Sequence, residues 1–389
     1  MPSMTRRGAL GTLAGLVGSV AGCTALRDDD SPPFERSWYV GFRKPSSVAT
    51  TSSGQLLAGS HSPFRDQPVV AELDVETGET TWSVTMPKGG RSPIGVRDDR
   101  AYAVSKAEQM VAVDTATGAA VWRRQLEPLD AADPGVVEFA PLSLGDRVIV
   151  PLSGTEDDVP DRVVGVARAD GETLFTHGLS ASLSGAPGAM ADSIVLPLVD
   201  GRVRCLDRDG SIRWTQRIDG ALSAVGTGDG LVYLGAATEE VIALNAATGA
   251  IEWRQSLANT VFARPLVTDD RVYVGGANYS LRAFDTSGQQ LWRDDLDNAV
   301  THGPMQVGDR LVTLVGVAHR IRGHSGTIPF SPPVLYVHDR DGTRRRTVRL
   351  DDQRFEGGGV EWAQVAGDTV YLGQSFGLTR VAPEVITDA

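Results

Sequence analysis

The sequence is poor in cysteine and lysine, and it has no long hydrophobic run. Cys23 and Cys205 are the only cysteines, so a disulfide-rich scaffold is excluded. Lysine occurs only at positions 44, 88 and 106, and arginine supplies the other basic side chains. The apolar run at residues 9–21 is too short to span a bilayer as a helix. Stability must therefore come from a packed core, which 389 residues with 41% hydrophobic content can supply.

Positive charge and common catalytic motifs are also missing. A net charge of -12 opposes nucleic-acid binding by Coulomb repulsion. The chain has no H-E-x-x-H or P-loop pattern. The Asp-Arg-Asp-Gly segments at 207–210 and 339–342 resemble the start of a calcium loop but lack its twelfth-position glutamate. We interpret both segments as turns and expect neither a metal site nor a catalytic residue.

What the sequence does contain is a repeated unit, clearest at residues 264–292. Its pattern predicts short strands at 266–268, 271–275 and 281–285, and a fourth strand around Leu291 and Trp292. Turn residues such as Asp269, Asp270 and Gly288 separate these strands. Four strands in about 30 residues make a meander that cannot bury both of its faces alone. The unit therefore requires further copies of itself. We label the four strands of each unit A to D in chain order.

The segment that contains strand C, the C–D turn and strand D occurs seven times. Its pattern is a small residue, then Asp or Asn, then a glycine in the turn, and then a tryptophan four residues after the glycine. Five good copies end in Trp82, Trp122, Trp214, Trp253 and Trp292. Two worn copies are read as Val166, Arg168, Gly171, Phe175 and as Val337, Asp339, Gly342, Arg346. Trp82 and Trp122 lie 40 residues apart, and Trp214, Trp253 and Trp292 follow one another at intervals of 39, a period typical of four-stranded propeller blades. The glycine supplies a positive φ, and the tryptophan offers a large surface to bury between blades.

The pattern A-x-D-x-x-x-G-x-x-x-W resembles the tryptophan-docking motif of pyrroloquinoline-quinone-like propeller repeats. Such repeats occur in quinoprotein alcohol dehydrogenases and in the assembly lipoprotein BamB. The resemblance covers residues 48–350 and implies an all-β propeller of four-stranded antiparallel blades. It does not decide the function, because the motif is a packing device shared by enzymes and scaffolds.

An eighth blade is predicted from both ends of the repeat region. Residues 360–382 supply strands A, B and C but no tryptophan strand. Residues 38–42 form an orphan apolar strand that begins with Trp38. If the N-terminal strand completes the last blade, the ring closes and no edge remains free. We expect eight blades, with seven as the alternative if 360–382 packs otherwise.

The N-terminal residues have the features of an export signal and a lipid-anchoring site. Arg6 and Arg7 precede the apolar run, as in a twin-arginine signal, and residues 20–23 resemble a lipobox with Cys23 as the lipidated residue. We predict a signal peptide over 1–22, a flexible tether over 23–35 and one propeller domain over 36–385. The alternative is a cleaved signal with an incidental cysteine. A lipid anchor at Cys23 predicts that the protein is held at the outer face of the cytoplasmic membrane. The lysine-poor composition, together with the twin-arginine signal, favours a haloarchaeal, salt-tolerant source.

Variable loops predict where a partner binds. The A–B and C–D turns are uniformly short, whereas the B–C loops at 60–68, 153–161 and 317–333 and the D–A links at 127–137 and 351–359 are longer. All of the longer connections belong to one face. We expect the partner contact around the longest loop, in blade 7, formed by His302, His319, Arg320, Arg322, His324, Phe330 and Glu356. The alternatives are a metal or anion site and an ordinary solvated loop.

Two functions remain open from the sequence. The first is a non-catalytic, lipid-anchored scaffold, monomeric and without a cofactor, that binds an extracytoplasmic protein or a surface polymer. The second is a dehydrogenase dependent on pyrroloquinoline quinone and calcium. The family's enzymes carry an adjacent cysteine pair that this chain lacks, so the resemblance favours the scaffold.

Overall fold

The computed structural model describes residues 34–61, 68–87, 89–90, 92–105, 109–126, 139–152, 161–220, 222–317, 332–350 and 359–388. These residues belong to one compact unit and form eight four-stranded antiparallel sheets. The predicted signal peptide over 1–22 and Cys23 lie outside the described residues, so the domain boundaries proposed there stay predictions. No helix in the described ranges is long and apolar enough to cross a bilayer.

Each sheet is one blade, named here from its innermost strand outward. Blade 1 contains β2 (Pro45–Thr50), β3 (Leu56–Ser60), β4 (Pro68–Leu73) and β5 (Thr80–Thr85). Blade 2 contains β6 (Gly95–Arg97), β7 (Arg100–Val104), β8 (Gln109–Asp114) and β9 (Ala120–Gln125). Blade 3 contains β10 (Leu142–Leu144), β11 (Arg147–Leu152), β12 (Arg162–Ala167) and β13 (Thr173–Gly178). Blade 4 contains β14 (Gly188–Ala189), β15 (Ser193–Pro197), β16 (Arg202–Asp207) and β17 (Ile212–Arg217).

The second half of the chain continues the series. Blade 5 contains β18 (Gly226–Gly228), β19 (Leu231–Ala236), β20 (Glu240–Asn245) and β21 (Ile251–Ser256). Blade 6 contains β22 (Leu266–Val267), β23 (Arg271–Gly276), β24 (Ser280–Asp285) and β25 (Gln290–Asp295). Blade 7 contains β26 (Val300–Val307), β27 (Arg310–Val315), β28 (Val334–Asp339) and β29 (Arg344–Arg349). Blade 8 contains β30 (Val360–Ala366), β31 (Thr369–Gln374), β32 (Gly377–Val381) and, as its outer strand, β1 (Arg36–Val40), and the helix α1 (Glu384–Thr387) follows β32.

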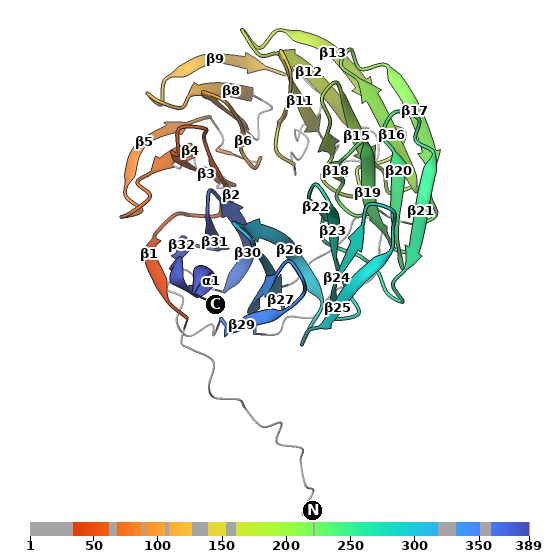
Figure 1. The fold of residues 1–389 in the computed structure, drawn as a ribbon. Coiled ribbons are helices and arrows are strands. Elements are labelled where there is room, and N and C mark those ends of the chain that lie inside the picture. Colours follow the sequence, from red (N-terminus) through yellow and green to blue (C-terminus); the bar gives the residue numbers. More distant parts are fainter. Residues whose placement is uncertain are drawn as a thin grey trace, which may run out of the picture. The chain divides into compact units, whose positions relative to one another are not determined.

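The blades close into a ring, as predicted. Each innermost strand contacts the innermost strand of the next blade, and the series returns from β30 to β2. Figure 1 shows the blades following one another in chain order, with β1 beside β32. β1 pairs antiparallel with β32, so that Trp38 lies opposite Arg380. Closure by the N-terminal strand is confirmed, although the strand begins and ends two residues earlier than the predicted 38–42.

The core lies between the sheets, because strands B and C are buried on both faces. In blade 5, every residue of β19 after Leu231 is buried, whereas the outer strand β21 alternates between exposed and half-buried positions. Tyr102, Tyr233, Tyr273, Tyr336 and Tyr371 are fully buried on such middle strands. The strands are therefore stabilised by contacts with both neighbouring blades, as a stacked repeat requires.

The predicted tryptophans join each blade to the next. Trp214 of blade 4 packs on Gly249 of blade 5, where a Cβ atom would lie 2.5 Å from the indole ring. Its indole N–H donates to the carbonyl oxygen of Ala246 in the same turn at 2.9 Å. The equivalent pairs are Trp38 on Gly78, Trp82 on Gly118, Trp122 on Gly171, Phe175 on Gly210, Trp253 on Gly288 and Trp292 on Gly342. The glycine therefore serves the turn and also makes room for the neighbouring aromatic ring.

The tryptophans are not equally buried. Trp38, Trp122 and Trp214 are buried, whereas Trp253 and Trp292 are half-buried. Trp82 is also half-buried, and its indole nitrogen is buried without a hydrogen-bond partner. The strand that carries these rings is the outermost of its blade, so one edge of a ring can remain open to solvent.

Both worn copies are explained by the structure. In blade 3, Phe175 lies opposite Gly165, and Gly171 donates to the carbonyl of Ala167, so Gly165 and Ala167 occupy the places assigned to Val166 and Arg168. That reading was wrong by one residue because the C–D turn of blade 3 has the longer form found in blades 1, 2 and 5, in which the turn glycine donates to the carbonyl four residues before it and not three. In blade 7, the guanidinium of Arg346 donates to the carbonyl oxygens of Glu384 and Asp388. The next blade presents α1 there, so a hydrogen-bonding side chain replaces the tryptophan.

Candidate functional site

Of the residues predicted to contact a partner, only His302 lies in the described part of the chain. His319, Arg320, Arg322, His324, Phe330 and Glu356 lie outside the described residues. His302 is half-buried in β26, the innermost strand of blade 7, and pairs with Leu314. Its Nδ1 lies 3.3 Å from the hydroxyl oxygen of Thr301. The predicted cluster therefore stays a prediction.

The described residues do mark the same face, through two exposed aromatic side chains. Tyr279 is 51% exposed in the B–C turn of blade 6, and Phe376 is 57% exposed in the B–C turn of blade 8. Blade 7, with the long loop of the prediction, lies between these two blades. The other large exposed hydrophobic residues of the described ranges lie on outer strands, at Val121, Leu174, Ile212, Ile251 and Leu291. Sequence reasoning missed the two aromatics, although each is a large apolar residue in a polar turn.

Tyr279 is also conformationally strained. Its φ is 59°, a left-handed conformation that is unfavourable for a bulky side chain. Gly201 and Glu239 occupy the equivalent turn position in blades 4 and 5, and each offers its carbonyl oxygen to the residue just after strand D. Glycine would satisfy this turn without strain, so the backbone does not require a tyrosine. An exposed aromatic ring at a strained position suggests a role outside the fold.

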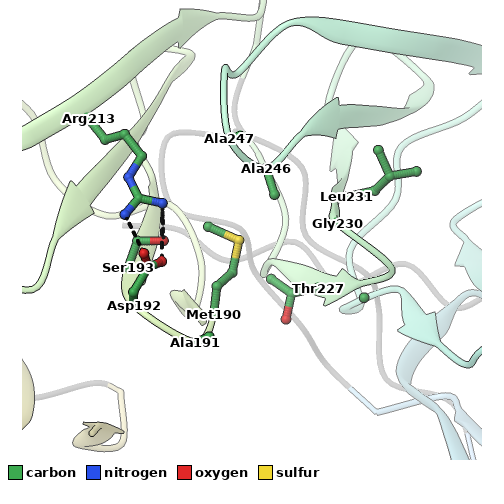
Figure 2. Close-up of a pocket in the computed structure, with 11 residues that line it drawn as sticks. Met190, Ala191, Asp192, Ser193, Arg213, Thr227, Gly230, Leu231, Ala246 and Ala247 are labelled. Atoms are coloured by element: carbon green, nitrogen blue, oxygen red, sulfur yellow. Dashed lines mark hydrogen bonds and ion pairs between the residues drawn. The ribbon is translucent and has the colours of Figure 1, made fainter. Parts of the chain in front are cut away.

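A pocket lies on the opposite face, between blades 4 and 5. It has a volume of about 380 Å³ and is lined by the A–B turns of both blades and the C–D turn of blade 5. Figure 2 shows Met190, Thr227, Leu231 and Ala246 around it. These turns are short, and the sequence contains no loop insertion that would have indicated a pocket here.

The charged residues of this pocket are already paired. The Arg213 guanidinium donates to Asp192 at 2.9 Å, as the dashed lines in Figure 2 show, and also contacts Asp207. Hydrogen bonding and charge attraction from Arg213 lower the pKa of the Asp192 carboxyl. The pocket is therefore an apolar hollow beside a neutralised ion pair, and it offers no group for acid–base chemistry.

A larger cavity lies among the innermost strands at the centre of the ring. Its volume is about 730 Å³, and strands of blades 3 to 8 line it. Among the described residues of its wall, Arg264, just before β22, is the one that carries a charge. The remaining wall is mostly apolar, with residues such as Val225, Leu266 and Met305, and includes Gln306 and Gln364.

Elsewhere, arginines form ion pairs between neighbouring blades. Arg168 of blade 3 contacts Asp98 of blade 2 at 2.9 Å, and Arg340 of blade 7 contacts Asp270 of blade 6. These pairs reach from a C–D turn to the preceding blade's A–B turn and give the arginines of that face a structural role. In the ranges that the structure describes, no group of three or more His, Cys, Asp or Glu side chains could hold a metal ion.

Two buried reactive side chains are structural as well. Cys205 is fully buried opposite Trp214, and burial raises the pKa of its thiol, which makes a nucleophilic role unfavourable. His338 is fully buried in β28, and its Nε2 lies 2.7 Å from the carboxylate of Asp294 in blade 6. Burial lowers the pKa of His338, while Asp294 acts in the opposite direction. Sequence reasoning missed His338.

Known proteins share both the sequence pattern and the fold. A family profile described as outer membrane protein assembly factor BamB matches residues 35–193 and 199–317. BamB of Yersinia pestis is 25% identical over 292 residues, which are 65% of this chain and 72% of that protein. The crystal structure of BamB from Moraxella catarrhalis superposes with a TM-score of 0.65 and 16% identity, covering 89% of this chain and 99% of that one.

A designed protein has the same architecture. The computationally designed Ika8 protein superposes with a TM-score of 0.66 and 14% identity, covering 90% of this chain and 98% of the designed one. Similarity at this level of identity shows the fold alone. The profile match, which extends over more than half of the residues, is the stronger finding: the chain belongs to the family of the outer membrane protein assembly factor BamB.

Proposed function

We propose that this protein is a non-catalytic scaffold that binds an extracytoplasmic protein partner on the face of the B–C turns around blade 7. The observation that carries the proposal is the exposure of Tyr279 and Phe376 on the two blades that flank blade 7. Rigid aromatic side chains are enriched at protein interfaces because they bury much area at a small entropic cost. The predicted contacts at His302, His319, Arg320, Arg322, His324, Phe330 and Glu356 belong to the same face.

A protein partner is favoured over a surface polymer by two considerations. The relatives named above are described as assembly factors for outer membrane proteins, which is a role in protein association. The two aromatics also lie on separate blades, so a ligand that contacts both must extend across blade 7. The scaffold is proposed to act as a monomer, because one chain supplies all eight blades and needs no second copy to close the ring.

The quinone-dependent dehydrogenase is the weaker alternative. Calcium needs several oxygen ligands, and the central cavity wall contains no acidic residue within the described ranges. Cys205 is buried in blade 4 and has no neighbouring cysteine in the sequence. These residues do not fit a quinone with its calcium ion, and we propose no cofactor. An absorbance spectrum of protein mixed with the quinone and Ca²⁺ would contradict this if it showed a bound chromophore.

The partner contact can be tested without disturbing the fold. Tyr279→Gly combined with Phe376→Ser should reduce capture of the partner from native membranes at least tenfold, because both apolar anchors are lost. The melting temperature should not fall, because glycine relieves the strained φ at position 279. Ile212→Ser combined with Leu291→Ser, which removes equally exposed residues from outer strands, is the matched control. Equal capture by both double variants would refute the proposed face, as would unchanged capture after shortening residues 319–331.

The membrane anchor is a separate part of the proposal. We propose that the chain is exported by a twin-arginine signal and held at the outer face of the cytoplasmic membrane through lipidated Cys23. Cys23→Ser should therefore move the protein from the membrane fraction to the medium, because the predicted signal run is too short to span the bilayer. A variant that stays in the membrane pellet after a salt wash would contradict lipid anchoring. Its partner capture should stay normal, which separates the anchor from the binding face.

A further inference from the structure

The central cavity holds an arginine whose environment differs from that of the other arginines described above. Arg264 lies in the interior of the ring, surrounded by the walls of the cavity, and its side chain remains open to the cavity's solvent. Its one hydrogen bond to a described residue is long, from Nη2 to the carbonyl oxygen of Pro187 in blade 4 at 3.4 Å. Within the described ranges, no carboxylate lies within ion-pair distance of it, whereas Arg168, Arg213 and Arg340 each contact an aspartate.

The protein itself uses few of the hydrogen-bond donors of Arg264. A guanidinium offers five N–H donors, and a single distant carbonyl satisfies few of them. The surrounding cavity walls lower the pKa of the Arg264 guanidinium by desolvation, although its side chain is exposed to the solvent of the cavity. The group stays charged at neutral pH because arginine does not lose its proton in proteins. Because no carboxylate of the described ranges neutralises the guanidinium, its charge and most of its donors are available to a ligand of opposite charge.

The walls of the cavity indicate what kind of anion would fit. Pro187, Val225, Leu266 and Met305 present apolar surface around the single cation. Gln364 contributes a polar group, and because its Oε1 accepts from the backbone N–H of Val48 at 3.1 Å, its amide N–H groups are available to a ligand. A volume of about 730 Å³ lies within the usual range of small-molecule sites.

We propose that the central cavity is a binding site for a small organic carboxylate, with the carboxylate held by Arg264 and an apolar body packed against the cavity wall. One guanidinium matches the planar carboxylate with two parallel hydrogen bonds. Inorganic phosphate would need more donors and would leave the apolar wall uncovered, so it is disfavoured. This site does not depend on the partner contact proposed above, because it lies on the innermost strands and not in the B–C turns.

The proposal is tested by calorimetric titration of the full-length protein with 3-phenylpropanoate, using 3-phenylpropanol as the uncharged control and inorganic phosphate as the competing anion. We expect saturable binding of the carboxylate alone. Arg264→Met should weaken that binding by about 10- to 100-fold, the usual effect of losing a charged hydrogen-bonding partner. Arg217→Met removes the same charge from an exposed position on β17 and should leave the affinity unchanged.

A second measurement separates a ligand-binding arginine from a structural one. Arg264→Met should melt at a temperature equal to or above that of the wild type, because the substitution removes an unpaired charge and retains the apolar stem. A clearly lower melting temperature would overturn the proposal by showing that Arg264 supports the ring through Pro187. The absence of carboxylate binding, equal binding of phosphate, or unchanged affinity in Arg264→Met would also overturn it.

Discussion

The contact between each tryptophan and the glycine of the next blade can be tested quantitatively in blade 5. Gly249 and Gly230 have almost the same positive φ, 73° and 72°, so an alanine is strained by the backbone to the same extent at both. A Cβ at Gly230 would meet nothing within 4 Å, whereas a Cβ at Gly249 would lie 2.5 Å from the Trp214 ring. The difference between the two alanine variants therefore measures the packing contact alone.

The expected magnitudes follow from these two effects. Gly230→Ala should lower the free energy of unfolding by about 1–2 kcal/mol, the cost of a left-handed conformation for a residue with a Cβ. Gly249→Ala should lower the free energy of unfolding by about 1–3 kcal/mol more than Gly230→Ala does, because the indole of Trp214 must move within a packed interface. Trp214→Ala should cost about 3–5 kcal/mol, since it empties the space between the blades. Denaturant titration followed by circular dichroism measures all three without relying on the tryptophan signal.

A double variant makes the reasoning refutable. In the Trp214→Ala background, Gly249→Ala should cost no more than Gly230→Ala, because the ring that it would meet is absent. The coupling energy should therefore equal the additional cost of the single Gly249→Ala variant. If Gly249→Ala and Gly230→Ala cost the same in the wild-type background, the ring does not pack tightly on the glycine and this account of the repeat motif is wrong.

Two further predictions concern ring closure and pH. A chain that starts at residue 45 lacks β1 and, with it, the packing of Trp38 on Gly78. It should therefore melt well below the intact domain. An unchanged melting temperature would contradict closure by the N-terminal strand. Burial lowers the pKa of His338 below the value of 6.5 for an unperturbed histidine, so the unfolded chain binds the proton more readily than the folded one. Stability should therefore be complete above pH 6.5 and should decrease as the pH falls below it, and His338→Gln should flatten that dependence in melting curves between pH 7.5 and 5. An identical slope in His338→Gln would show that other groups control it.

The sequence alone carried enough information for the architecture. The period of 39 or 40 residues, the turn glycine and the tryptophan four residues later are local features, because each blade is built from about 40 consecutive residues. Closure by the N-terminal strand also followed from counting, since the last unit lacked a strand and the first residues supplied one. The misassigned repeat in blade 3 shows the limit of counting, because the C–D turn occurs in two lengths, with the accepting carbonyl either three or four residues before the turn glycine.

The tertiary structure decided which residues can act outside the fold. The indole nitrogen of Trp82 has no hydrogen-bond partner. The carbonyl of Thr115 occupies the turn position where other tryptophans find their acceptor, but it accepts from the side chain of Gln55 in the preceding blade. Arg264 resembles other arginines in sequence and becomes distinct only because the ring surrounds it and places no acid beside it. Tyr279 and Phe376 are nearly 100 residues apart, and ring geometry places them on either side of blade 7. Such properties depend on neighbours from other blades, and a repeat pattern describes only the contacts that every blade shares.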